Sequence, residues 1–290
     1  MKIFASRTPY RSRRRRRLAL KEGSRYTLLM VLAVLFLAPF LWLVSIALKT
    51  QSQLAIFPIL FWPSQADWQN FVQALTLVPF WNYAANSVIL AMIYAVLTTF
   101  SSALVGFGFA RLKGRGKRLW FVVLLSTMML PQIVTLIPTY VLFARLNLVN
   151  TYWPWALWGV GASPFLVFLY RQFFAAIPID LEEAAILDGC GYGQIFWRIF
   201  LPLSLPVIVT AFLLSFVWVW GDYVTPTLLL SQDNTTLAVA ISASYVDPNN
   251  DPLPNVQAAA ALLYILPEIV VFFFAQRYFV RGIVTSGLKG

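Results

Sequence analysis

Long apolar stretches alternate with short polar segments along the whole chain. A helix that crosses a bilayer needs about 20 mostly apolar residues. Stretches of that length lie at 26–48, 83–110, 119–144, 146–170, 205–230 and 256–276. The helix in the fourth stretch is expected to begin near Trp153. The pattern therefore predicts an all-α integral membrane protein with six transmembrane helices.

Composition supports this prediction and removes several classes of function. Of the 290 residues, 60% are hydrophobic and 11% are charged, whereas a soluble domain carries about 25% charged residues. Such a chain has too few charges to cover a water-facing surface, so its apolar side chains are expected to face lipid. Cys190 is the single cysteine and there is no histidine. No internal disulfide, His-based triad or metal site is predicted.

The net charge of +11 indicates orientation. Twenty of the 22 Lys and Arg residues fall on one side of the predicted membrane, and Lys49 and Arg145 fall on the other. Basic loops stay in the cytoplasm, so both termini are predicted to be cytoplasmic, and nucleic acid need not be invoked. The expected parts are a basic cytoplasmic segment 1–25, a membrane domain 26–280 and a cytoplasmic tail 281–290. The arginine run 13–17 suits anionic lipid headgroups.

The first apolar stretch has a second interpretation, a cleavable signal peptide with a basic flank. Its apolar run exceeds the 7–15 residues of a signal-peptide core. We therefore expect it to remain as the first transmembrane helix.

One inner segment, 178–204, is long and has the signals of folded structure. Asp180 with Glu183 three residues later predicts a capping box at the start of a short helix, 181–188. Gly189 can adopt the left-handed conformation that ends it. A second helix would follow, and Pro202 would mark the return to the membrane. The apolar face of that second helix would hold Ile195, Phe196, Ile199 and Phe200. The pattern alone fits either a structural elbow between two spans or a docking site for another protein.

The spacing within this segment resembles the EAA motif of the permease subunits of ABC importers. The motif-matching residues, to which the resemblance assigns coupling to an ATPase, are Glu183, Ala184, Ala185, Asp188, Gly189, Ile199, Leu201 and Pro202. Residues 276–290 and 129–138 are also similar to the maltose-type, MalG-like permeases. The resemblance implies that the elbow between the fourth and fifth helices is a coupling helix that docks on a cytoplasmic ATPase. It also implies that the tail 281–290 reaches the ATPase.

The resemblance also implies the partners and the cargo. These would be a second permease chain, two ATPase subunits and an extracytoplasmic solute-binding protein, in the cell membrane of a prokaryote. The chain has no Gly-x-x-x-x-Gly-Lys-Ser/Thr phosphate loop, so it is expected to be a transport subunit without a cofactor of its own. ATP and magnesium would bind the partner ATPase. The cargo would be a sugar, an oligosaccharide or a polyol, with a polyamine or an amino acid as the alternative.

Polar residues inside the predicted spans are candidates for a solute path. Ionisable groups within a bilayer are costly and point to function. Asp222 and Glu268 are such groups. The residues expected along the path are Asp222, Tyr223, Trp220, Asn86 and Gln132. Carboxylate and amide oxygens accept hydrogen bonds from sugar hydroxyls, and aromatic rings cover the apolar face of the sugar ring.

Each of these residues has a structural interpretation as well. Asp222 can cap a helix break at Gly221 or contact a partner subunit, and Glu268 can lie at a subunit interface. Asn86, Gln132 and Thr135 can make bonds between helices. A different class of protein, an ion-coupled secondary transporter, would use Asp222 and Glu268 for ions. Such transporters contain inverted repeats, and we find no convincing repeat.

The outer loop 231–255 is rich in Asp, Asn and Pro. By the resemblance, it would contact the solute-binding protein. The residues expected at that contact are Asp233, Asn234, Asp247 and Asn249. An ordinary solvated hairpin is the alternative interpretation.

Overall fold

The computed structural model describes residues 9–286, with side-chain surroundings for 22–274 and 276. The predictions for residues 1–8 and 287–290, parts of the N-terminal segment and tail, lie outside the described residues. Within the described chain there is no β-sheet, and an isolated antiparallel bridge joins Val246 and Pro252. The prediction of an all-α membrane fold is confirmed.

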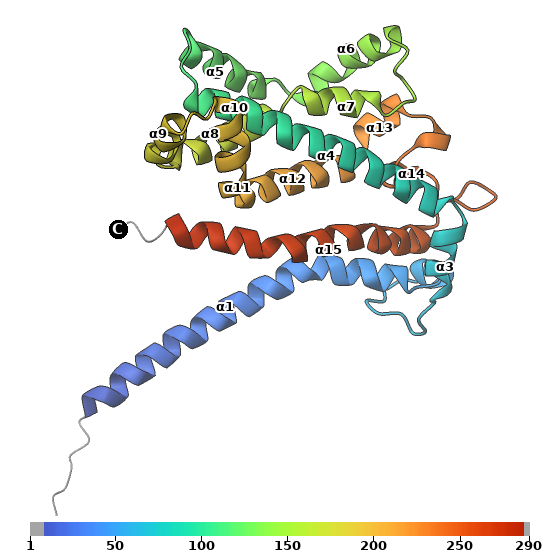
Figure 1. Cartoon of the computed structure of the whole chain (residues 1–290). Coiled ribbons are helices and arrows are strands. Elements are labelled where there is room, and N and C mark those ends of the chain that lie inside the picture. The colour runs from blue at the N-terminus through green and yellow to red at the C-terminus, as the bar shows by residue number, and fades with distance from the viewer. Residues whose placement is uncertain (1–8, 287–290) are drawn as a thin grey trace, which may run out of the picture.

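The molecule contains three long helices (Figure 1): α1 (Pro9–Ala47), α4 (Phe80–Arg111) and α15 (Pro254–Ser286). The shorter α-helices are α2 (Gln51–Leu54), α3 (Gln69–Thr76), α5 (Lys117–Ser126), α6 (Gln132–Arg145), α7 (Trp153–Val160), α8 (Pro164–Ala176), α9 (Ile179–Leu187), α10 (Tyr192–Ile195), α11 (Leu201–Leu203), α12 (Leu205–Trp220), α13 (Val224–Leu229) and α14 (Leu237–Ala243). Two 3-10 turns, η1 (Thr127–Met129) and η3 (Gln232–Asn234), and a π turn, η2 (Phe196–Phe200), complete the set.

Among the described residues, three single helices are long and apolar enough to cross a membrane: Glu22–Ala47, Phe80–Arg111 and Pro254–Phe274. Three further pairs of helices meet this test only when joined across a bend of 96°, 76° or 81°. The number of spans rises to six if each bent pair is one span. The number of six transmembrane spans therefore stays a prediction.

The prediction of one continuous helix over 119–144 is wrong. The chain bends by 96° between η1 and α6, at Leu130 and Pro131. Proline forces the residue before it out of the helical region, and Leu130 is extended with ψ 118°. The proline also lacks the amide that would continue the helix. The fourth stretch is likewise interrupted, between α7 and α8.

The packing core of the bundle forms around α4, against which α7, α8 and α12 pack. Small residues allow this close approach. A β-carbon added at Gly106 would lie 2.6 Å from the Cβ atom of Tyr170 on α8. The Ser102 hydroxyl on the same helix accepts a 2.9 Å hydrogen bond from the Ser163 amide. The helices α1 and α15 pack against each other at the edge of this bundle (Figure 1).

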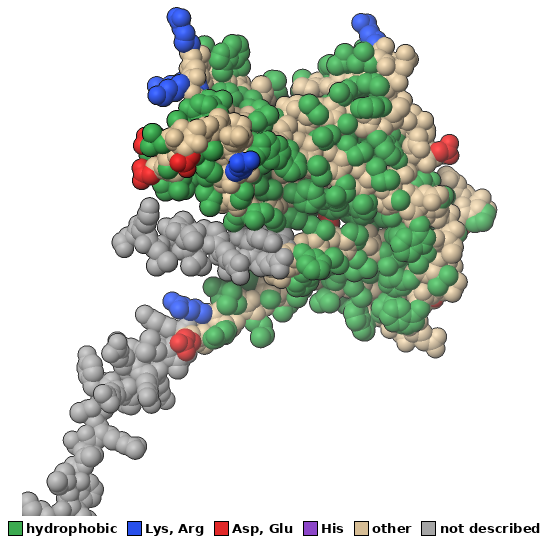
Figure 2. All heavy atoms as spheres, viewed as in Figure 1, with side chains coloured by type: hydrophobic (Ala, Val, Ile, Leu, Met, Phe, Trp, Pro, Cys, Tyr) green, Lys and Arg blue, Asp and Glu red, His purple; other side chains and the backbone are tan. Residues whose placement is uncertain are grey.

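The surface agrees with a membrane location. On α1, the side chains of Tyr26, Met30 and Phe36 are 68–73% exposed. In Figure 2 hydrophobic side chains spread over the middle of the molecule, while the charged side chains lie toward its periphery. This distribution suits contact with lipid or with other membrane subunits.

Candidate functional site: an elbow and a cavity along one helix

The elbow begins where α8 ends and Pro178 starts α9 (Ile179–Leu187). The predicted capping box is wrong, because Pro178 is the N-cap residue and makes no side-chain cap hydrogen bond. Proline has a fixed φ that suits a helix start, so α9 begins two residues earlier than predicted. Asp180 lies instead in the first turn, where a carboxylate interacts favourably with the helix dipole.

Gly189 ends α9 as predicted. Its φ of +83° is in the left-handed region, which glycine adopts without the cost that a side chain would add. The amides of Gly189 and Cys190 donate to the carbonyls of Ile186 and Ala185, at 3.0 and 2.9 Å. This glycine is therefore the bend between the two arms of the elbow.

The second arm consists of α10, the π turn η2 and α11, and it bends by 81° into α12. The predicted apolar face is confirmed, since Ile195, Phe196 and Phe200 are buried. Phe200 packs its ring 5.0 Å from that of Phe107 on α4 and 5.6 Å from that of Phe174 on α8. The inner aromatic cluster, defined here as Phe107, Phe174, Phe196 and Phe200, holds the elbow against the bundle.

The motif-matching residues divide between two faces of the elbow. The exposed members are Glu183, Ala184, Asp188, Gly189 and Pro202. Ala185 and Leu201 are buried and Ile199 is half-buried. One face is therefore available to another protein, and the other anchors the elbow to α4 and α8.

Two residues that the sequence did not single out meet beneath the elbow. Arg111, the last residue of α4, donates from Nη2 to the carbonyls of Phe174 (2.7 Å) and Ile177 at the end of α8. Its Nη1 lies 3.5 Å from Oε2 of Glu182 on α9, and the two side chains are only 9% and 8% exposed. The adjacent pair Glu182–Glu183 was one hint, since neighbours on a helix face different directions.

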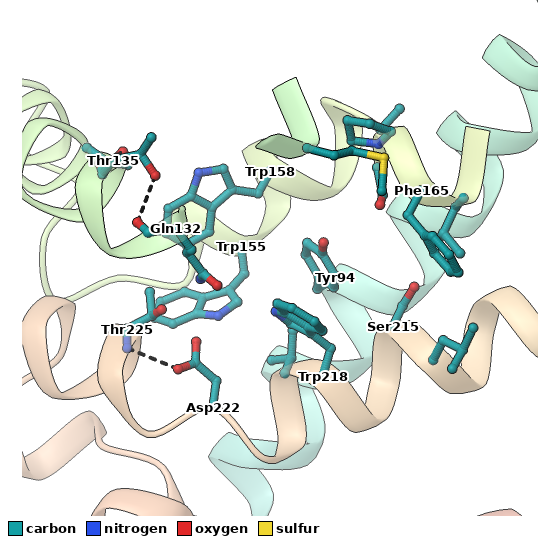
Figure 3. Close-up of a pocket in the computed structure, with 18 of the residues that line it drawn as sticks. Tyr94, Gln132, Thr135, Trp155, Trp158, Phe165, Ser215, Trp218, Asp222 and Thr225 are labelled. Carbon is teal, nitrogen blue, oxygen red and sulfur yellow. Dashed lines mark hydrogen bonds between the residues drawn. The ribbon is translucent and has the colours of Figure 1, made fainter. Parts of the chain in front are cut away.

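A cavity of about 680 Å³ lies farther along α12, toward the end opposite the elbow. Its aromatic and polar lining includes Tyr94, Trp155, Trp158, Trp218, Gln132, Thr135, Thr139, Ser215, Asp222 and Thr225. Figure 3 shows the side chains of Gln132 and Asp222 entering it from α6 and from the end of α12, beside the indole rings. The broken helix at Leu130 and Pro131 places α6 on this cavity.

Of the residues expected along the path, Asp222 and Gln132 line this cavity, and the others lie elsewhere. Trp220 is buried and stacks on Tyr264 of α15, with ring centroids 5.2 Å apart. The Asn86 amide donates to the Thr235 carbonyl at 3.1 Å, which is a contact within the protein. Tyr223 is exposed outside the cavity, and Glu268 is not among the lining residues.

Asp222 lines the cavity and also makes a capping contact, while its place on a solute path stays a prediction. Its Oδ1 accepts a 3.1 Å hydrogen bond from the Thr225 amide and so caps the start of α13. Within the described residues, Oδ2 has no hydrogen-bond partner. A second polar atom of the same side chain therefore remains free at the cavity wall.

Comparison with known proteins decides the identity of the chain. Residues 102–285 match the model of the family described as binding-protein-dependent transport system inner membrane component. The chain belongs to this family of ABC importer permeases. The matched region begins within α4 and contains the elbow and all of the cavity lining except Tyr94.

Individual relatives agree with this assignment. The permease is 32% identical to the probable ABC transporter permease protein YurM of Bacillus subtilis, over 95% of this chain and 91% of the relative. It is 29% identical to the arabinooligosaccharides transport system permease protein AraQ of Halalkalibacterium halodurans (86% and 96%). It is 31% identical to the lactose transport system permease protein LacG of Rhizobium radiobacter (90% and 94%).

The fold agrees as well. A crystal structure of a bacterial ABC transporter involved in alginate import aligns with a TM-score of 0.74, covering 96% of this permease and 100% of that chain. Its sequence is 24% identical. This neighbour supports the fold. The family match makes the permease a multi-pass membrane subunit of a binding-protein-dependent ABC transport system, which implies a solute-binding protein and an ATPase as partners.

The loop 231–255 is ordered by hydrogen bonds of its own. The Asp247 carboxylate accepts 2.8 Å hydrogen bonds from the amides of Asn249 and Asp251. The Asn234 amide donates to Asn150 Oδ1 at 3.2 Å, while Asp233 and Asn249 are exposed. The loop thus presents polar groups at the end of the molecule opposite the elbow, and its contact with the binding protein stays a prediction.

Proposed function

We propose that this permease carries a sugar, an oligosaccharide or a related polyol into the cell, driven by ATP that a partner chain hydrolyses. The cavity beside α12 carries the proposal. It offers aromatic rings together with the amide of Gln132 and the carboxylate of Asp222. The relatives AraQ and LacG are named for arabinooligosaccharides and lactose.

The chemistry of the cavity suits a neutral polyhydroxylated solute. A sugar presents hydroxyl groups at its edge and C–H groups on its faces. Carboxylate and amide oxygens accept hydrogen bonds from the hydroxyls, and indole rings cover the apolar faces. The volume lies within the range of small-molecule sites.

The proposed machine contains a second permease chain and two ATPase subunits besides this permease. The exposed motif residues Glu183, Ala184 and Gly189 form the face that docks on an ATPase. ATP binding closes the ATPase pair and displaces the elbow, and the helices then adopt a second packing that opens the cavity outward. Each nucleotide state selects one of two packings through its differential affinity.

The test begins with co-purification of the ATPase subunits in mild detergent. Wild-type permease is expected to bring them down, and Glu183→Ala is expected to reduce their yield at least five-fold. Asp233→Ala is the matched control, because it removes an exposed acid at the opposite end. The proposed docking face is contradicted if wild-type permease brings down no ATPase. It is also contradicted if both variants lose the same amount of ATPase.

The cargo is tested by uptake into proteoliposomes that hold the whole complex and ATP. Labelled lactose and arabinooligosaccharides are compared with spermidine and methionine, each with the solute-binding protein present. ATP-dependent uptake of a sugar alone supports the proposal. Uptake of spermidine or methionine without any sugar uptake contradicts the proposed cargo and leaves the ATPase docking face unaffected.

A further inference from the structure

The contact between Arg111 and Glu182 joins three elements at one guanidinium group. Arg111 is covalently part of α4, its Nη2 binds two carbonyls at the end of α8, and its Nη1 faces Glu182 of α9. The guanidinium also lies 5.0 Å from the ring centroid of Phe200 in the second arm of the elbow. A single buried cation therefore touches both arms of the elbow and both helices beneath it.

The two neighbouring glutamates of α9 face opposite ways. Glu183 is exposed on the proposed docking face, and Glu182 is buried against Arg111. A force applied to α9 at the exposed Glu183 would therefore reach the bundle through the adjacent residue, Glu182, and its contact with Arg111. Charged contacts are directional, unlike the apolar contact that Ala185 makes with the inner aromatic cluster.

The contact between Arg111 and Glu182 leaves some of its hydrogen-bonding atoms without a partner in this structure. At 3.5 Å the pair attracts electrostatically, yet Arg111 Nε and Glu182 Oε2 are both buried without a hydrogen-bond partner. Buried unpaired polar atoms are costly, so a movement of α9 that gave either atom a hydrogen-bond partner would be favoured. An element with two discrete arrangements is what coupling between distant sites requires.

The other end of this connection is the cavity wall. The helix α4 is continuous from Phe80 to Arg111, and Tyr94 on α4 lines the cavity. At 1.5 Å per residue, Tyr94 lies roughly 25 Å along the helix from Arg111. A displacement at Arg111 is thus carried to the cavity by an unbroken helix, whereas α12 and α6 each follow a bend.

We propose that Arg111 is a positioning residue for transport, which transmits the displacement of α9 through Glu182 to α4 and so to the cavity wall. The inference rests on the proposed function, since it needs an ATPase that displaces the elbow. The simpler alternative is that the pair only stabilises the packing of the elbow on the bundle. Apolar residues in place of the pair could preserve such packing, but they would remove a charged contact that transmits movement.

The test uses the whole complex in nanodiscs, with Cys190→Ser as background and Thr139→Cys as a reporter in the cavity. The rate at which a membrane-impermeant maleimide labels this cysteine is measured with and without ATP and vanadate. The main variant is Arg111→Met with Glu182→Leu, because replacing a buried ion pair by apolar residues commonly keeps a protein folded. Glu182→Gln is the second variant, and Asp180→Asn is the matched control on the same helix.

The reporter complex and Asp180→Asn are expected to change their labelling rate at least five-fold with ATP and vanadate. The double variant is expected to assemble and hydrolyse ATP, yet to change its labelling less than two-fold, with Glu182→Gln between them. A wild-type response in the double variant overturns the inference and leaves the proposed function standing. If the double variant does not assemble, a wild-type response in Glu182→Gln overturns it. A reporter complex without an ATPase contradicts the proposed function itself.

Discussion

The two ends of α12 differ in how many of the polar and aromatic side chains near them already have partners within the protein. At the elbow, Phe200 is enclosed by Phe107 and Phe174, and the charge of Arg111 is paired. At the other end, Trp218 is 65% exposed and the Oδ2 atom of Asp222 has no partner in the described structure. One end is packed against its neighbours, and the other leaves groups open to the cavity, where we propose that the solute binds.

This contrast explains how one helix can serve both tasks. The apolar contacts among Phe107, Phe174 and Phe200 leave few alternative packings, so this cluster is expected to move as a unit. The adjacent contact of Arg111 with Glu182, in contrast, can change. A cavity lined by free polar groups gains contacts when a ligand enters. Under the proposed function, the packed end would pass on a displacement and the open end would change its affinity for the solute. Substitutions at the packed end, at the open end and between them are expected to have different effects.

The largest expected effect comes from Gly106→Leu on α4, at the packed end. The added β-carbon would lie 2.6 Å from Cβ of Tyr170 and 3.2 Å from the Val167 carbonyl. Overpacking of this kind costs about 1–3 kcal/mol, occasionally more. We expect loss of most monodisperse protein in size-exclusion chromatography. Gly108→Leu is the control, since a β-carbon at Gly108 meets nothing within 4 Å, and equal loss in both would refute this packing.

At the open end, Asp222→Asn is expected to reduce ATP-dependent sugar uptake about ten-fold, equivalent to about 1.4 kcal/mol. Asparagine keeps the cap on the Thr225 amide and removes the charged acceptor. Assembly with the ATPase should be unchanged. Asp67→Asn is the matched control, because Asp67 Oδ1 caps Gln69 at 3.0 Å outside the cavity. Uptake that survives in Asp222→Asn would show that the carboxylate only caps α13.

Gly189→Ala sharpens the role of the bend in the elbow. A side chain at φ +83° costs about 1–2 kcal/mol. We expect a lower melting temperature and weaker co-purification of the ATPase. Gly191→Ala is the control, since Gly191 has φ −77° and open space around its α-carbon. Identical melting temperatures for the two variants would contradict the left-handed bend.

The smallest effect is expected for Ser102→Ala, between the two ends. Its hydroxyl accepts the 2.9 Å hydrogen bond from the Ser163 amide, just before α8. Losing one such bond costs about 0.5–1.5 kcal/mol. The melting temperature should fall slightly while uptake per complex stays constant. Ser126→Ala, whose exposed hydroxyl bonds only its own turn, should not shift it.

Much of the elbow was predictable because its signals are local. Gly189 and the prolines act on their own backbone, and the apolar face of the second arm follows from helix spacing. The capping box failed because Pro178 could begin the helix earlier than Asp180. The continuous helix over 119–144 failed because length and apolarity outweighed the signal of Pro131.

The cavity could be predicted only in part. Asp222 and Gln132 were marked by their polarity within apolar stretches, and both line it. Trp155, Trp158 and Trp218 gave no signal, since an indole in a span suits lipid, core or cavity equally. The pairing of Arg111 with Glu182 joins positions 71 residues apart in sequence, and one sequence carries no record of such contacts. Tertiary packing decides these cases.

The most direct test of the account measures sugar uptake into proteoliposomes under two driving forces. The complex of this permease with its partner permease, its ATPase subunits and the solute-binding protein is supplied either with internal ATP or with a pH gradient alone. The account predicts uptake with ATP, its loss on Glu183→Ala, and none with the gradient. Uptake driven by the gradient without ATP would contradict it and point to an ion-coupled transporter that uses Asp222 and Glu268.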